Sequence, residues 1–497
     1  MKKRLMLVPA LGILLFASSC KKTVTPDPIT KAPIAVTREE LTKDSIYLYS
    51  QQIYLWNVGM PTRNEFNPLK YGTNQDVLNA IKNLPSTGKP VDKYSFLDEG
   101  GVATNLSGNT VPAGDYGFSV FFNTATDLRV KYVYKGSAAD LKGVKRGDRI
   151  TSFGGRTDVN GSSQSFIDLL NASLFGNSTS IPMTIQKSTG GSSDVVITRG
   201  SFSLNPILYS NVYTVGSKKV GYIVFNSFTT NIIDKLDVVF ADFAAKDITE
   251  VIVDLRYNGG GSVNTAVEFT NLIAPPAENG KLMFTTFFNA TMQSGMATIL
   301  QNQKFWGTGN DGVRRMYSMF DYSYAPTKTA GNLEEFAKRG SANKISRAYF
   351  LVTGSTASAS ELLINNLKPV MDVKVIGRKT YGKPVGFFSV KIDKYDLYVP
   401  QFQTKNRLNF GDYYDGFVPD VDLADDVTKD FGDITERYLS YALNYAEKGN
   451  FTLSLAKLNL LSSTAPLPKS IEAELSSELS KHEFKGMIDD RPHFKFK

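Results

Sequence analysis

The chain has 497 residues, which is long for a single domain and predicts about two to four folding units. Hydrophobic residues make up 42% and charged residues 21%, a composition typical of a globular protein with sizeable cores. The net charge is +8, but three of the positive charges lie within the first four residues and no run of five basic residues occurs. This distribution argues against a nucleic-acid partner.

The first twenty residues have the pattern of an export signal. A positively charged start is followed by an apolar run over residues 5–16, which is too short to span a bilayer comfortably. Small residues at 17–19 then form a cleavage region that leads to Cys20, the only cysteine of the chain, which can therefore form no internal disulfide. The segment resembles a bacterial lipoprotein signal in which Cys20 carries the lipid, although Ala17 stands where such signals usually have Leu. We expect an exported lipoprotein held at the membrane of the cell envelope; an ordinary secretory signal is the alternative.

The chain then changes character several times. Residues 21–37, rich in Lys, Thr and Pro, predict a flexible tether. Residues 38–110 predict a small helical domain, which begins at a capping pattern after Thr37. Residues 446–497 are a polar tail, with helical periodicity near 471–479 and no function that the sequence reveals.

Residues 111–202 predict a β-rich domain. Its expected strands lie at 117–121, 128–134, 149–153, 181–186 and 195–197, with a helix over 163–170. The loop Tyr116-Gly117-Phe118-Ser119 resembles the carboxylate-binding loop of a PDZ domain, and residues 135–150 resemble that fold's signature in bacterial proteases. Consecutive N–H groups in such a loop can hold a C-terminal carboxylate while the peptide adds to a sheet edge. A plain β-turn is the alternative for each glycine.

Residues 203–445 alternate between strand-like and helical segments, which is typical of an α/β domain. We expect strands at 220–225, 251–255, 348–352 and 373–376, and helices at 232–245 and 360–367. The fold class predicted for the whole chain is therefore multidomain α/β.

Ser358 lies in a small-residue turn between a predicted strand and a predicted helix. Such a turn can expose a serine hydroxyl and can direct the N–H of Ala359 toward a developing oxyanion. Ser358 and Glu361 also match a capping box, so that taken alone the turn is better explained as a helix cap.

A serine nucleophile needs a base, and the two histidines of the chain, His482 and His493, both lie in the last sixteen residues. Lys383 is the remaining candidate, because the nine-residue stretch that contains it carries no other charge and burial can lower a lysine pKa by several units. An exposed turn is the commoner place for a Gly-Lys-Pro sequence. A third segment, in which Gly259 and Gly260 follow a buried strand, can present N–H groups to an anion. Neither spacing of a phosphate-binding loop is present, and a plain turn is the alternative.

Together these segments resemble the carboxy-terminal processing, or tail-specific, protease family. The middle serine of that family's S-A-S-A-S-E motif falls on Ser358, with Thr356 in a tolerated position, and the family lysine 25 residues later falls on Lys383. Residues 254–256 with the glycines after them match its oxyanion segment, and 416–420 match a further family signature.

The resemblance implies an α/β core related to the crotonase and Clp-protease folds, in which Ser358 and Lys383 act as a dyad. Gly259 or Gly260, together with Ala359, would stabilise the oxyanion. It also implies substrates cleaved near unstructured C-termini that the PDZ-like domain captures. No cofactor is expected, and one cysteine with two tail histidines predicts no metal site.

One position departs from the family. Many members have a glutamine four residues after the lysine, where it orients that lysine, and this chain has Phe387. Gln401 and Gln403 are nearby in sequence but cannot be assigned to this role. The alternative function is therefore a catalytically impaired, membrane-tethered protein that binds peptides or other ligands.

Overall fold

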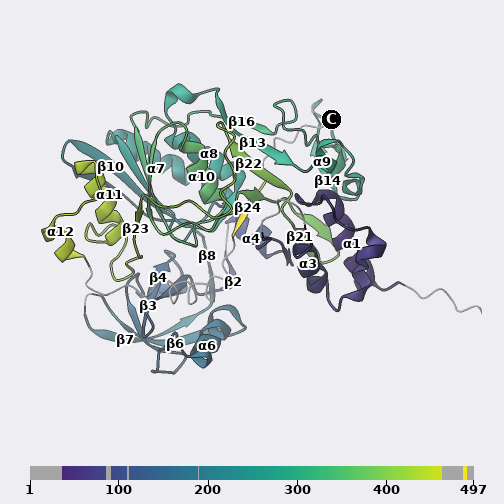
Figure 1. The fold of residues 1–497 in the computed structure, drawn as a ribbon. Helices are drawn as coiled ribbons and strands as arrows, with labels where there is room; N and C mark the ends of the chain where they lie inside the picture. The colour runs from purple at the N-terminus through teal and green to yellow at the C-terminus, as the bar shows by residue number, and fades with distance from the viewer. Residues whose placement is uncertain are drawn as a thin grey trace, which may run out of the picture.

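The computed structural model describes residues 36–85, 91–108, 111–188, 190–309, 311–461 and 485–489. They form a mixed α/β multidomain protein, with a large α/β core, a β-rich unit below it and the N-terminal helices to one side (Figure 1). Cys20, the predicted tether and the predicted helix near 471–479 lie outside the described residues. Within the described ranges, every helix falls short of the length and apolar character that a bilayer-spanning helix needs.

The N-terminal segment is helical, as predicted. Thr37 caps the first helix through a capping box with Glu40, the start that the sequence indicates. The helices are α1 (Arg38–Ile53), α2 (Arg63–Phe66), η1 (Pro68–Lys70), α3 (Asn74–Lys82) and α4 (Gly101–Ser107). The apolar side chains of α1, α2 and α3 join the same buried cluster as the α/β core, and those of α4 join a smaller one around Phe387. Strand β1 (Phe96–Asp98) also pairs with β21 (Tyr395–Tyr398), so this segment is fastened to the core by a sheet as well.

The β-rich unit has a core of its own beneath a five-stranded antiparallel sheet in the order β3-β4-β5-β6-β7. Its strands are β3 (Phe118–Thr124), β4 (Asp127–Val133), β5 (Arg149–Phe153), β6 (Ser180–Gln186) and β7 (Ser192–Thr198). Its helices are α5 (Ala138–Leu141) and α6 (Gln164–Phe175), and β2 (Val111–Asp115) pairs with β8 (Gly200–Phe202) beside it. All five predicted strands and the predicted helix are confirmed, and β3 lies at the edge of the sheet.

The α/β core is built on a six-stranded sheet in the order β23-β18-β17-β11-β10-β9, parallel except for β9. Its strands are β9 (Ile207–Val215), β10 (Lys218–Phe225), β11 (Glu250–Asp254), β17 (Arg347–Val352), β18 (Asp372–Gly377) and β23 (Val421–Asp422). Helices α7 (Ile233–Ala245), α8 (Val263–Ile273) and α10 (Ala359–Leu367) cover one face, and α11 (Arg437–Lys448) covers the other. The four core strands and two helices that the sequence predicts are all present, and α11 continues past the predicted boundary at residue 445.

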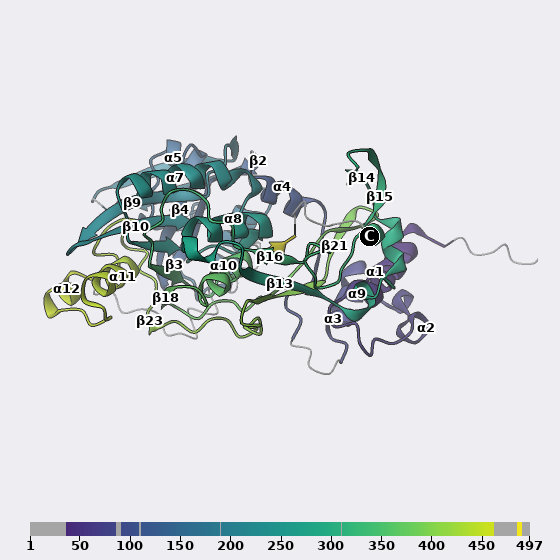
Figure 2. The ribbon, with the colours of Figure 1, turned by 90° about the horizontal axis from the view of Figure 1, so that it is seen from above.

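Smaller sheets connect the core with the N-terminal helices. In Figure 2, β13 runs out of the core toward these helices, where β21 also lies. The four-stranded sheet β16-β13-β22-β19 consists of β13 (Leu282–Phe288), β16 (Leu333–Glu335), β19 (Val385–Gly386) and β22 (Phe402–Asn406). Other elements here are α9 (Ala290–Gln293), β14 (Lys304–Thr308), β15 (Arg314–Ser318), β20 (Val390–Ile392) and the short turns η2 (Thr230–Ile232), η3 (Pro276–Glu278), η4 (Thr298–Asn302) and η5 (Met319–Asp321).

The C-terminal region contributes two further elements. Helix α12 (Leu455–Leu460) lies beside α11, and β24 (Gly486–Ile488) pairs with β12 (Gly260–Ser262). Strand β24 is the yellow arrow at the centre of the molecule in Figures 1 and 2. A segment that the sequence places in a polar tail therefore lies inside the protein.

Candidate active site

Three loops meet at the carboxyl edge of the central sheet, where open α/β sheets usually bind ligands. One follows β11 and carries the glycines, one follows β17 and carries Ser358, and one follows β18 and carries Lys383. Neighbouring parallel strands end at the same edge, so three segments up to about 130 residues apart in sequence converge here.

Ser358 has a strained main chain. Its φ of 63° and ψ of −111° lie in a region that non-glycine residues rarely adopt, which costs about 1–3 kcal/mol. The residue is fully buried, and its Oγ has no hydrogen-bond partner among the described residues. A strained serine between a strand and a helix, with an unpaired hydroxyl, has the geometry of a nucleophile turn. Thr356 stabilises this turn, because its hydroxyl donates to the main-chain oxygen of Leu255 at 2.7 Å.

Glu361 links the Ser358 turn with the Lys383 loop. One carboxylate oxygen accepts the N–H groups of Ser358 and Lys383 at 2.8 Å each. The other accepts the N–H of Gly382 at 2.7 Å and the hydroxyl of Thr380 at 2.6 Å. Burial raises the pKa of this carboxyl group, while the four donors oppose the shift. The helix cap that the sequence indicates therefore also fixes the two candidate catalytic residues relative to each other.

Asn258 connects the glycine segment to the serine turn. No sequence pattern around this residue predicts that role. Its main-chain oxygen accepts from the N–H of Ala357 at 3.1 Å and from the hydroxyl of Ser360 at 3.0 Å. Its side-chain oxygen accepts the N–H of Gly260 at 2.9 Å. A Cβ placed on Gly260, where φ is +111°, would lie 3.0 Å from the nitrogen of Ala359. The predicted oxyanion groups are therefore adjacent, but the N–H of Gly260 is already engaged.

Lys383 is buried with 1% of its surface exposed, and burial lowers its pKa well below the ordinary lysine value. The negative charges of Asp92 and Glu361 oppose that shift, and the charge of Lys485 adds to it. Its Nζ donates to the main-chain oxygen of Lys485, and no hydrogen bond joins it to Ser358 among the described residues.

Two aromatic rings surround the Lys383 Nζ where a polar group was expected. The Phe387 ring centroid lies 4.0 Å away and that of Tyr94 lies 5.7 Å away. Tyr94 comes from the N-terminal segment, which the sequence did not connect with this site. Neither glutamine left open above orients the lysine. Gln401 exchanges two hydrogen bonds of 3.0 Å with the main chain of Phe388, and Gln403 donates to Gly411 and Asp412.

The predicted peptide-binding loop lies close to the glycines. A cavity of about 300 Å³ is lined by Tyr116, Phe118 and Ser119 on one side and by Gly259 and Gly260 on the other. The N–H of Gly117 donates to its neighbour Asp115 at 2.6 Å, so that donor is not open to a ligand. The Tyr116 hydroxyl donates to main-chain oxygens of the β-rich unit, which makes this side chain part of the unit's framework.

A buried charge cluster joins the β-rich unit to the glycine segment. Arg146 donates to the Tyr257 hydroxyl at 2.7 Å, and Tyr257 donates in turn to Asp425. Arg256 pairs at 2.7 to 2.8 Å with Asp254, Asp425 and Glu436. Arg146 lies in the glycine-rich stretch that suggested the PDZ-like fold, yet the sequence gives no sign that it reaches the core. Removing one partner of such a buried network lowers the folding stability by about 3–5 kcal/mol. The network therefore holds the glycine segment firmly in place.

Comparison with known proteins agrees with this geometry. Residues 219–421 match the model of peptidase family S41. A C-terminal processing peptidase of the chloroplast from Tetradesmus obliquus is 22% identical over 67% of this chain and 65% of its own length. A protein of Staphylococcus aureus (strain bovine RF122 / ET3-1) described as a CtpA-like serine protease is 25% identical over 50% of this chain and 40% of its own length. The chain thus matches less than two thirds of the length of either relative.

Among solved structures, one from Bacteroides fragilis NCTC 9343, described as a candidate S41 protease, matches with a TM-score of 0.54 and 22% identity. The match covers 82% of this chain and 97% of that one, and it is a likeness of fold. The resemblance that the motifs indicate is therefore confirmed: over residues 219–421, the α/β core of this chain is similar to peptidase family S41.

Proposed function

We propose that this protein is a serine endopeptidase in which Ser358 is the nucleophile and Lys383 the general base. The observation that supports this most is the Glu361 carboxylate, which holds the main chains of both residues through one oxygen atom at 2.8 Å each. A strained serine with an unpaired hydroxyl and a buried lysine are thereby fixed in one site. Held in this way, the two groups supply the positioning that catalysis needs.

In the proposed reaction, neutral Lys383 takes the proton of Ser358 as the Oγ attacks the substrate carbonyl carbon. The lysine then gives this proton to the leaving amine, and water hydrolyses the acyl-enzyme with the lysine again as base. The N–H groups of Ala359 and Gly259 donate hydrogen bonds to the oxyanion. Gly259 is preferred over Gly260, because the N–H of Gly260 already donates to Asn258.

Phe387 supports a different way of holding the base. A glutamine oxygen would accept a hydrogen bond from Nζ, whereas an aromatic ring fills the space and attracts only the charged form. Burial opposes that form, and it is the largest influence on the pKa of Lys383. We infer that the ring positions the lysine while burial keeps it neutral. Phe387 also keeps open the alternative of a binding protein without cleavage.

We further propose that substrates are polypeptides with free C-termini captured at the edge strand β3 of a PDZ-like unit. Among the described residues, no strand pairs with the outer edge of β3, and Phe118 and Ser119 line the cavity that reaches Gly259. Lipidation at Cys20 would hold the enzyme at the membrane of a bacterial cell envelope, a proposal that depends on the sequence of the first twenty residues.

The test is cleavage of a disordered polypeptide by the chain that begins after residue 20, followed by mass spectrometry. Wild type should release fragments, and Ser358→Ala should release none. The same polypeptide with an amidated C-terminus should be cleaved about tenfold more slowly, since the captured carboxylate is gone. If wild type and Ser358→Ala leave the polypeptide equally intact from pH 6 to 10, the protein is a binding protein instead.

The rate of cleavage should rise with pH. The neutral form of Lys383 is the active one, and burial lowers its pKa, so the midpoint of the rise should lie clearly below the ordinary lysine value of 10.5. The measurement is kcat/KM for a short peptide substrate from pH 5 to 11. A midpoint at 10.5 or above would exclude Lys383 as a buried base.

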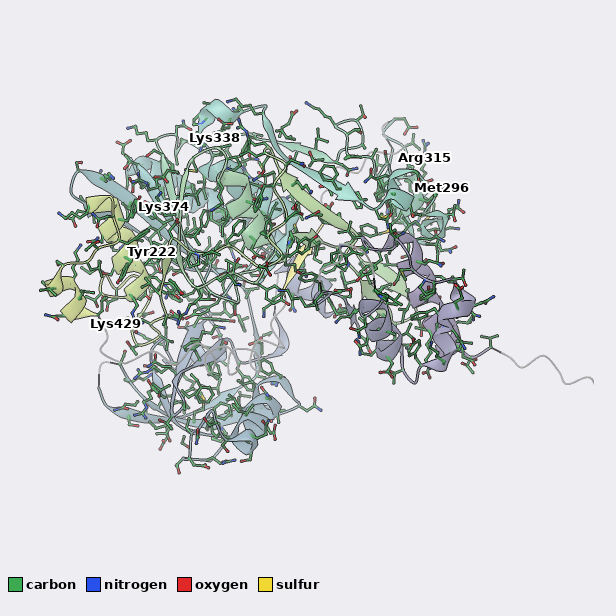
Figure 3. The ribbon with its side chains drawn as sticks, in the orientation of Figure 1. Tyr222, Met296, Arg315, Lys338, Lys374 and Lys429 are labelled. Carbon is green, nitrogen blue, oxygen red and sulfur yellow. The ribbon has the colours of Figure 1, made fainter. Side chains whose placement is uncertain are left out.

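Lys338 supplies the control for this profile. Burial lowers its pKa to about 8, and its Nζ donates to the main-chain oxygens of Leu272 and Ala342 at 2.7 and 3.1 Å. Figure 3 labels it at the upper edge of the core, away from β24. Lys338→Met should therefore leave the midpoint of the profile unchanged.

A further inference from the structure

Residues 485–489 lie as an extended strand across the candidate active site, between β12 and the chain at Phe387. We propose that this slot is the groove for the substrate peptide and that the protein's own residues 485–489 fill it like a substrate, so that they restrict entry of other polypeptides. The proposal rests on the proposed protease function, and it names the substrate class as an extended peptide with a small residue followed by two apolar ones.

Main-chain hydrogen bonds hold the strand on both sides. On one side β24 runs parallel to β12, with Gly486 opposite Gly260, and the N–H of Gly486 donates to the oxygen of Gly259 at 3.1 Å. On the other side, the N–H of Phe387 donates to the oxygen of Met487 at 2.8 Å. The N–H of Asp489 returns a bond of 2.8 Å to the oxygen of Phe387. These contacts are main-chain hydrogen bonds to an extended peptide, the kind that form when a peptide adds to a sheet as an extra strand.

Both walls of the slot carry glycine where the strand comes closest. A Cβ on Gly260 would meet the oxygen of Gly486 at 2.3 Å, and a Cβ on Gly386 would meet the ring of Phe402 at 2.1 Å and the oxygen of Met487 at 2.9 Å. Any side chain at these wall positions would push the strand out. Glycine in a strand often marks a place where another main chain approaches closely.

The side chains of the strand enter apolar surroundings. Met487 is fully buried in the main apolar cluster. Ile488 is 6% exposed and packs in the cluster that contains Tyr94, Val385 and Phe387. Gly486 is buried opposite Gly260, so the strand itself carries no side chain at this position. The preferred peptide should therefore have a small residue followed by two apolar residues.

The strand also engages the candidate base. Lys383 Nζ donates to the main-chain oxygen of Lys485, the carbonyl that precedes Gly486. The Lys485 ammonium lies 4.9 Å from the ring centroid of Tyr381, in the same loop as Lys383. The strand therefore contacts both the candidate base and the glycine segment, which is where the proposed reaction needs a substrate peptide to lie.

The test compares peptide binding with and without the docked strand. The probe is a fluorescent peptide with the sequence of residues 484–490, Phe-Lys-Gly-Met-Ile-Asp-Asp, and all binding variants carry Ser358→Ala so that no cleavage occurs. Met487→Asp in the full chain places a charge at a fully buried position and should free the slot. The affinity for the probe should rise at least about tenfold, as expected when an internal competitor is displaced.

Two controls accompany this comparison. Leu455→Asp makes the same kind of change at a position that is 79% exposed and outside the strand, and it should not alter binding. A probe with aspartate in place of methionine should bind none of the proteins. In the protein that keeps Ser358, Met487→Asp should also raise kcat/KM for a disordered polypeptide about tenfold.

The possible results separate the two proposals. Probe binding that Met487→Asp increases, without cleavage by any variant, would support the groove and reject the protease. Cleavage by wild type, with probe binding and kcat/KM unchanged in Met487→Asp, would reject the groove and keep the protease. If Met487→Asp abolishes the cooperative thermal transition and binds no probe, the strand is an integral part of the fold, and the inference is wrong.

Discussion

Replacing Lys383 with methionine is expected to lower the rate of peptide cleavage by about 10²- to 10⁴-fold, the usual contribution of a positioned general base. Methionine keeps the apolar stem against Phe387 and removes the amine. The measurement is kcat/KM at several pH values. A variant with wild-type turnover would remove Lys383 from the mechanism, even if Ser358→Ala is inactive.

The same variant should be more stable than wild type at neutral pH. Burial makes the pKa of Lys383 lower in the folded chain than in the unfolded one, so the unfolded state binds more protons between these two values. Wild type therefore loses stability as pH falls below about 10.5, by about 1.4 kcal/mol for each unit of pKa lowering. Thermal unfolding should show the gain of Lys383→Met shrinking as pH rises and vanishing above 10.5. A gain that does not depend on pH would contradict this origin.

Replacing Glu361 with glutamine is expected to destabilise the protein by about 2–4 kcal/mol and to slow cleavage. The carboxylate accepts four donors, two on each oxygen, and a glutamine NH₂ would face one of these pairs. The Ser358 turn and the Lys383 loop would then lose part of their common anchor. Denaturant unfolding measures the stability, and kcat separates the loss of positioning from weaker substrate binding.

A pH profile distinguishes the charge of Glu361 from its structural role. Its negative charge raises the pKa of Lys383, so Glu361→Gln should move the midpoint of the rate profile to lower pH. Glu250→Gln is the matched control. Glu250 is also buried and accepts from Tyr349 at 2.6 Å and Arg347 at 3.0 Å, but it begins β11 at the opposite end of the sheet. It should cost stability without moving the midpoint. Equal shifts in both variants would mean that the effect is not local.

Most of the secondary structure could be predicted, because local patterns carry it. Strands β10, β11, β17 and β18 are short apolar runs, and α7 and α10 follow them with helical periodicity. The parallel order of these strands then brings their carboxyl ends to one edge. Ser358, Lys383 and the glycines were found by motif and spacing, and the structure brings them to this edge.

The surroundings of Lys383 could not be predicted. The ring of Tyr94 and the carbonyl of Lys485 come from parts of the chain far from Lys383, and only Phe387, four residues after the lysine, could be connected with it from the sequence. Neither Tyr94 nor Lys485 has a local pattern that points to a lysine. Arg146 is a similar case: its sequence context indicated a turn in the β-rich unit, whereas its guanidinium lies in a charge cluster of the core.

The sequence by itself determined the resemblance to a protease family, the order of helical and strand segments, and the two residues proposed as nucleophile and base. These depend on hydrophobic periodicity, capping and spacing, which act over a few residues. Only the tertiary structure decided that Glu361 joins the Ser358 turn to the Lys383 loop, that Asn258 binds the Ser358 turn, and that residues 485–489 lie beside Lys383. Pairing between segments about 20 to 100 residues apart depends on which edges and cavities the folded chain leaves unfilled, and no local pattern contains that information.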